Sequence, residues 1–111
     1  MGAVEGPPST EGEVHSLEVI RTARVCTLGG TDDVSDFWVA CHGYRQLAGR
    51  FIRRFAPVAT PSRRIVAPEG LSRFYISSDG GRHGSESRVG ATWMTREDRE
   101  NEITDYVRYL D

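Results

Sequence analysis

The chain has 111 residues and a mass of 12.4 kDa, which allows one small domain. Its 14 basic residues and 16 acidic residues leave a formal charge of -2, which gives no general attraction to nucleic acid or to an anionic membrane. No apolar run approaches the roughly 20 residues that a membrane-spanning helix needs. The N-terminus is acidic and rich in proline and glycine, unlike a secretory signal. We therefore expect a cytoplasmic protein without nucleic-acid or membrane partners.

The N-terminal part of the chain changes character twice. Residues 1–12 are predicted to be a disordered tail, so the folded domain is expected to span 13–111. Residues 14–28 are rich in Val, Ile, Leu and Thr with broken alternation, which predicts one bent strand or two short ones, followed by a Gly-Gly-Thr-Asp-Asp turn. The two cysteines, Cys26 and Cys41, form no Cys-x-x-Cys pair and are interpreted as small buried residues within strands.

The middle of the chain predicts a strand, a helix and a second strand. Residues 37–41 (FWVAC) are continuously apolar, which is typical of a parallel strand covered by helices on both faces. Residues 64–67 (RIVA) predict a second short strand. The helix between them is indicated by apolar residues at helical spacing, namely Leu47, Phe51, Ile52, Phe55 and Val58. This order predicts a βαβ crossover with parallel strands.

The C-terminal part is predicted to contain a long loop and a helix. Residues 71–90 are rich in glycine and serine and are expected to form a loop. Residues 95–98 (TRED) predict an N-cap with an acidic third position. The helix that follows would align Ile103, Tyr106, Val107 and Leu110 on one face. The expected fold class is therefore α/β, with a mixed sheet of about four strands and helices packed on it.

The most informative candidate site is the exit of the central strand, where Cys41 is followed by His42, Gly43 and Tyr44. Ligands of open α/β sheets bind beyond the carboxyl ends of the strands. A glycine allows the backbone to approach a ligand closely, and the Tyr44 amide would then face the cleft. An amide fixed there could stabilise a developing oxyanion. The simpler alternative is a glycine turn between a strand and a helix.

Three stretches of the sequence resemble the α/β-hydrolase superfamily. In chain order they are FWVACHGYRQLAGRFIRRFAPVA, RRIVAPEGLSRFY and RVGATWMTREDRENEITDYVRYLD. More narrowly, they resemble the phospholipase/carboxylesterase-like serine esterases of bacteria, over nearly all of 13–111. The resemblance implies that the backbone N–H of Tyr44 is one oxyanion donor and that His42 and Gly43 form the oxyanion turn. The family continues Tyr-Gly-Gln, whereas this chain has Arg45 between Tyr44 and Gln46.

The resemblance also implies that the nucleophile lies in a Gly-x-Ser-x-Gly elbow after the fifth strand, followed by Asp and His. The sequence contains no such elbow. We therefore expect the N-terminal part of an α/β-hydrolase domain, without a Ser-Asp-His triad and inactive alone. The intact protein would hydrolyse small or lipid-like carboxylic esters. The stretch Gly70-Leu71-Ser72-Arg73-Phe74 after a predicted strand differs from such an elbow at one residue, but Pro68 before it and the bulky Phe74 disfavour an elbow with Ser72 as nucleophile.

The remaining candidates concern binding. Trp93, Phe74 and Tyr75 are predicted to line a substrate pocket, or alternatively to fasten the long loop to the sheet. Cys41 and His42 would point to opposite faces of a strand, which disfavours a thiol–imidazole pair. The histidines lie in separate segments without ligand-like neighbours, so no metal and no other cofactor is expected; they are His15, His42 and His83.

A second hypothesis is a non-catalytic association module. In the hydrolase topology, the strand from Phe37 to Cys41 borders the fifth strand, which this chain lacks. Its apolar edge would then face water, and such an edge promotes association. This hypothesis predicts binding to a partner, or self-association, through that strand.

Overall fold

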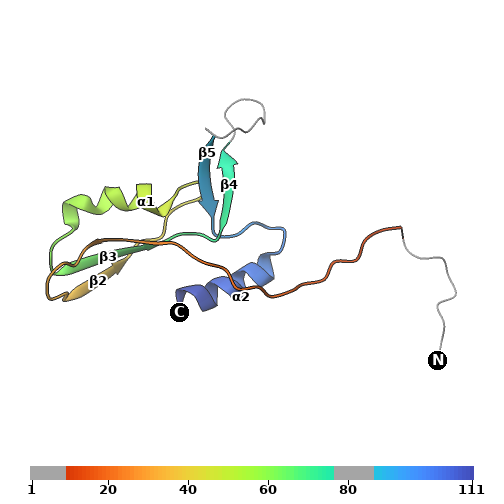
Figure 1. The fold of residues 1–111 in the computed structure, drawn as a ribbon, viewed down its shortest axis with the longest axis horizontal. Coiled ribbons are helices and arrows are strands. Elements are labelled where there is room, and N and C mark those ends of the chain that lie inside the picture. The colour runs from red at the N-terminus through yellow and green to blue at the C-terminus, as the bar shows by residue number, and fades with distance from the viewer. Residues whose placement is uncertain (1–9, 77–86) are drawn as a thin grey trace.

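The computed structural model describes residues 10–76 and 87–111. The elements in chain order are β1 (Val25–Gly29), β2 (Asp36–Val39), α1 (Ala48–Phe51), a 3₁₀ helix η1 (Ile52–Val58), β3 (Arg63–Pro68), β4 (Ser72–Ile76), β5 (Arg88–Thr92) and α2 (Arg99–Leu110). The strands form a three-stranded sheet and a separate two-stranded hairpin (Figure 1). The expected mixture of helices and a mixed sheet is present, but as two small sheets.

The three-stranded sheet has the order β1–β3–β2. β3 pairs antiparallel with β1, where Ile65 faces Leu28, and parallel with β2, where Ile65 faces Trp38. The helical segment α1–η1 connects the two parallel strands, so the predicted βαβ crossover is confirmed. β3 is central because it holds the most deeply buried apolar side chains of the sheet: Ile65 and Ala67 are fully buried.

The core lies between this sheet and α1–η1, which covers one face of the sheet (Figure 1). Ala48 and Ile52 pack here against Ile65 because a spacing of four places them on one helical face. The other face has no such cover, since Phe37 is 63% and Val39 68% exposed. The expectation of helices on both faces is therefore wrong, because β2 is the outer strand and no described segment packs on this side of it.

The hairpin β4–β5 stands upright beside the sheet (Figure 1). Its two strands include residues at both ends of the range 71–90 that was expected to be a loop. Its strands pair antiparallel, with Phe74 facing Gly90. The expectation of a loop over 71–90 is wrong at both ends, because Ser72–Ile76 alternates inward and outward side chains as a strand requires. Residues 77–86, including His83, lie outside the described residues.

The two ends of the chain differ from their expected boundaries. Residues 14–23 are extended but form no strand, because no described segment pairs with them, and the first strand begins at Val25. Of the predicted tail, residues 1–9 lie outside the description. The last helix begins at Arg99 and its N-cap is Asp98, without a side-chain cap hydrogen bond, so the N-cap lies within 95–98 but not at Thr95. The Thr95 N–H instead donates to Oε2 of Glu102 at 2.7 Å.

The apolar face expected on α2 is only partly buried. Tyr106 is 7% exposed, whereas Val107 is 65% and Leu110 is 50% exposed. The burial expected of the cysteines is also incomplete, since Cys26 is half-buried in β1 and Cys41 is exposed just after β2. No helix in 10–76 or 87–111 is long and apolar enough to cross a membrane.

Candidate functional site

His42 is the buried anchor of the turn that follows β2, with only 3% of its surface exposed. Its Nε2 accepts a hydrogen bond from the Gly70 N–H at 2.9 Å, so Nε2 carries no proton. Its Nδ1 lies 2.7 Å from the Gly43 carbonyl oxygen and therefore carries the hydrogen and donates it. With both nitrogens engaged by the backbone, the imidazole holds the turn in place and is not available as a base or as a partner of Cys41.

The backbone amides of the turn have different partners. The Gly43 N–H donates to Oε1 of Gln46, and the Gln46 N–H donates back to the Gly43 carbonyl at 3.2 Å. The Arg45 N–H donates to the Ala91 carbonyl on β5 at 3.0 Å. Within the described part of the chain, the Tyr44 N–H has no acceptor. Among these four amides, it is therefore the one that can donate to a ligand.

The turn requires an unusual backbone conformation and close contact with β5. Arg45 has a φ of +71°, in the left-handed region that favours glycine. The Ala91 N–H donates to the Gln46 carbonyl at 3.0 Å, which fastens the turn to the hairpin. A Cβ on Gly90 would lie 2.5 Å from the Arg45 carbonyl oxygen, so only glycine permits this approach.

Aromatic side chains surround the turn on two sides. The Tyr44 ring, 66% exposed, stacks on Phe74 with centroids 5.4 Å apart. Tyr75 follows Phe74 in β4 and therefore points to the opposite face of the hairpin. Trp93 stacks on the His42 ring at 5.0 Å and donates its Nε1–H to the His42 carbonyl at 2.8 Å. The structure thus places Phe74 beside Tyr44, and Trp93 behind the turn as a support.

Glu69 was not predicted as part of the site, although it is only 2% exposed and connects several elements. Its Oε1 accepts the Ala48 N–H at 3.2 Å, and its Oε2 accepts Nε–H of Arg24 at 2.8 Å and of Arg73 at 2.9 Å. Burial raises the pKa of this carboxyl group, but the hydrogen bonds from Arg24, Arg73 and Ala48 outweigh burial and lower the pKa below its ordinary value of 4.5. Glu69 is therefore a buried carboxylate, and the next residue, Gly70, is the one that binds His42.

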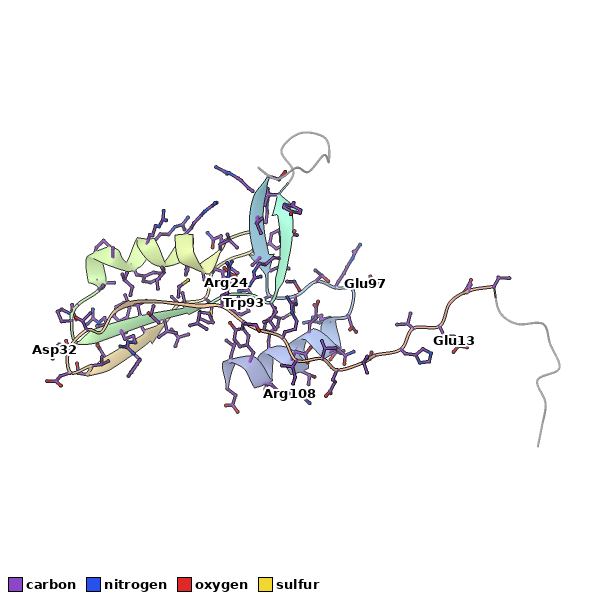
Figure 2. The ribbon with its side chains drawn as sticks, in the orientation of Figure 1. Glu13, Arg24, Asp32, Trp93, Glu97 and Arg108 are labelled. Atoms are coloured by element: carbon purple, nitrogen blue, oxygen red, sulfur yellow. The ribbon has the colours of Figure 1, made fainter. Side chains whose placement is uncertain are left out.

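Two tyrosines of α2 complete the support. The Tyr109 hydroxyl donates to the Glu69 carbonyl at 3.0 Å. The Tyr106 hydroxyl accepts the Leu71 N–H at 2.8 Å and donates to the Thr92 carbonyl at 3.3 Å. Burial raises the pKa of both hydroxyl groups, so both stay protonated as donors at neutral pH. Figure 2 shows Trp93 and Arg24 near the meeting point of the sheet, the hairpin and α2.

Other candidate residues lie apart from the turn. Ser72 is in strand β4 opposite Thr92, and no helix follows it directly, so it does not occupy a strand–turn–helix elbow. His15 is exposed, and its Nε2 lies 3.5 Å from Oε2 of Glu13. Over the residues that the structure covers, no three His, Cys, Asp or Glu side chains are grouped to hold a metal ion.

A groove of about 1030 Å³ lies apart from the turn. It lies between the extended residues 14–23 and α2, and its lining does not include Tyr44 or His42. Two exposed polar contacts join the extended segment to α2 along this groove: Asn101 Nδ2–H donates to the Ser16 hydroxyl at 3.3 Å, and Arg108 Nη1 lies 3.6 Å from Glu18 Oε1.

No model of a known protein family, no curated protein and no solved structure matches this chain. The function is therefore inferred from the turn and from the residues that hold it.

Proposed function

We propose that this chain carries one donor of the oxyanion hole of a serine esterase of the α/β-hydrolase type. The observation that carries this proposal is the Tyr44 N–H, which has no acceptor in the described chain while the three neighbouring amides of the turn are paired. In α/β-hydrolases, one oxyanion donor comes from the loop between the third strand and the first helix, the kind of loop in which Tyr44 lies. One such donor contributes roughly 2.7–4 kcal/mol to the transition state.

The arrangement of the strands supports the same proposal. β2 and β3 are parallel and joined by α1–η1, and the turn stands at the carboxyl end of β2, where open α/β sheets bind ligands. The outer edge of β2 has no partner strand in the described chain. In the resembling family, the strand that leads to the nucleophile elbow lies at this edge. A serine there would stand near the Tyr44 amide.

The chemistry follows from these positions. A serine from outside residues 1–111 passes its hydroxyl proton to a histidine, also from outside these residues, as its oxygen attacks the ester carbonyl carbon, and the C=O electron pair moves onto the carbonyl oxygen. When this pair returns, the alcohol leaves and takes up the proton. The Tyr44 N–H donates to this oxygen as it becomes negative, and His42 and Gln46 keep the amide in position. The stacked pair of Tyr44 and Phe74 offers an apolar surface for the acyl or alcohol group of small or lipid-like carboxylic esters.

The purified chain should not hydrolyse p-nitrophenyl acetate or butyrate above the buffer rate, because it contains no nucleophile elbow. The Ser72→Ala variant should behave in the same way. Turnover that disappears in Ser72→Ala would show that the nucleophile is inside the chain, contrary to the proposal.

The decisive test uses the DNA beyond codon 111, where the proposal predicts an in-frame strand and a Gly-x-Ser-x-Gly motif. In the longer protein, Tyr44→Pro removes the N–H and should lower kcat roughly 10²–10³-fold. Tyr44→Phe keeps the N–H and should lose far less. Absence of the motif, or an equal effect of the two variants with the fold intact by circular dichroism, would contradict the proposal.

A further inference from the structure

β2 is the outer strand of the three-stranded sheet, and within residues 10–76 and 87–111 no strand pairs with its outer backbone edge. The Asp36 N–H donates to the Ser62 carbonyl at 3.3 Å, and the Ala40 N–H donates to the Val66 carbonyl at 2.9 Å. Alternate residues of a strand point their backbone groups to the same side. The N–H and C=O groups of Phe37 and Val39 therefore point away from β3, toward the open edge.

We propose that a second copy of this chain covers this edge, with the two β2 strands antiparallel about a two-fold axis at Trp38. In this register, Phe37 of one copy faces Val39 of the other, and the two residues exchange both of their hydrogen bonds. The same pair recurs on the other side of the axis, which gives four N–H···O=C bonds. The two sheets then form one continuous sheet with the order β1–β3–β2–β2–β3–β1.

The side chains fit this register. Phe37 and Val39 share one face and are 63% and 68% exposed. The pairing places Phe37 of one copy beside Val39 of the other, which is a favourable cross-strand pair of an aromatic and a β-branched residue. Asp36, the one charged residue of β2, would face Ala40 of the second copy and is already paired with Arg63 at 3.1 Å. No like charges therefore face each other.

Nothing in β2 blocks the pairing. Edge strands that remain single usually carry a lysine, a proline or an inward-pointing charge. Residues 37–40 (FWVA) contain none of these, and the charge of Asp36 is compensated by its ion pair with Arg63, whose guanidinium lies over the Trp38 ring at 4.4 Å. This inference does not rest on the hydrolase proposal. In a longer polypeptide that supplies a strand at this edge, that strand and the second copy would compete for β2.

Sedimentation velocity of the purified chain, from low micromolar to near-millimolar concentration, tests the proposal. We expect the 12.4 kDa monomer to convert to a discrete dimer. Val39→Pro removes the outward N–H, and so two of the four bonds, without touching the side that faces β3. It should raise the dissociation constant about 10- to 100-fold.

The matched control is Val19→Pro, which places proline in the exposed extended segment 14–23 and should leave the dimer unchanged. If Val19→Pro weakens the dimer as much as Val39→Pro does, the extended segment is the strand donated to the edge, and pairing between the two β2 strands is wrong. A monomer at every concentration, or open-ended assembly, would also overturn the proposal. Activity of a longer protein bears on neither result.

Disulfide trapping tests the register and does not depend on the proline variant. In a background with Cys26→Ala and Cys41→Ala, Trp38→Cys places the two thiols opposite each other on the axis, and mild oxidation should link the two copies. Phe37→Cys faces Val39 and should link far more slowly. Equal or reversed rates, with an unchanged circular dichroism spectrum, would refute a two-fold axis at Trp38.

Discussion

Arg45 adopts a φ of +71° although it has a Cβ, a conformation that costs an L residue about 1–2 kcal/mol. Arg45→Gly removes this strain but adds freedom to the unfolded chain, so we expect the free energy of unfolding to rise by about 0.5–1 kcal/mol. Urea denaturation measures the change. The control Arg50→Gly, at an exposed position of α1, should instead lower it by about 1 kcal/mol. Equal losses in both variants would contradict the left-handed conformation.

Glu69 gives a pH-dependent prediction at the same scale. Its pKa is lowered in the folded protein, so its stabilisation is present above the ordinary value of 4.5 and is lost as the pH falls through the folded-state pKa. Glu69→Gln should therefore cost about 3 kcal/mol at neutral pH, because Arg24 and Arg73 lose their shared carboxylate, and less as the pH falls below 4.5 and through the folded-state pKa. Denaturation at several pH values measures the difference. The exposed Glu97→Gln should change stability by less than about 0.5 kcal/mol at any pH.

The pH trend is the part of this result that is specific to the carboxylate. A cost of Glu69→Gln that is the same at neutral and acidic pH would mean that the two arginines do not depend on its charge. Glu69 also shows the limit of sequence reasoning at a single residue. Its partners lie 45 residues before it, four residues after it and at the start of α1, and no local pattern in Pro68-Glu69-Gly70 indicates them.

At the scale of elements, local periodicity was sufficient for some predictions and insufficient for others. The crossover from β2 to β3 and the C-terminal helix follow patterns contained within each segment. Residues 14–23 also carry a strand-like composition, but a strand needs a partner, and none of the described segments offers one. The hairpin was missed because Gly90 interrupts the strand-like sequence pattern of β5. The contact that requires glycine at this position is with Arg45, which is 45 residues away in the sequence.

Gly90→Ala tests the junction between the hairpin and the turn. The added Cβ would lie 2.5 Å from the Arg45 carbonyl oxygen, a backbone atom that cannot move without breaking the bonds from Arg45 to Ala91 and from Ala91 to Gln46. We expect a loss of about 2 kcal/mol and faster hydrogen exchange at the Arg45 amide, measured by urea denaturation and NMR. In the control Gly49→Ala, the Cβ lies 3.7 Å from the Cys26 sulfur, and the α1 position should gain up to about 1 kcal/mol.

The opposite result would also be informative. If Gly90→Ala is tolerated while the Arg45 amide stays protected, the turn is not fastened to β5 as the hydrogen bonds indicate. The position of the Tyr44 N–H would then depend on His42 and Gln46 alone.

At the scale of the whole molecule, the Glu69 network defines where the cohesive part of the chain begins. Arg24 is the first residue tied to this network: its guanidinium binds Glu69, and its carbonyl accepts the Glu69 N–H at 2.9 Å. Before it, Leu17 and Ile20 are 87% and 101% exposed. The contacts of residues 14–23 with α2 are exposed polar ones, which contribute little.

Removal of residues 1–21 should therefore change the free energy of unfolding by less than about 0.5 kcal/mol, because the contacts of residues 14–21 with α2 are of this exposed polar kind. Removal of residues 1–24 should cost about 3 kcal/mol, since it also leaves Glu69 without one of its two arginine partners. Urea denaturation of the two shortened chains, beside the full chain, measures both steps. A large loss in the first deletion would contradict this and would place residues 14–21 within the cohesive fold. Equal stability of the two deletions would instead show that Arg73 alone neutralises Glu69.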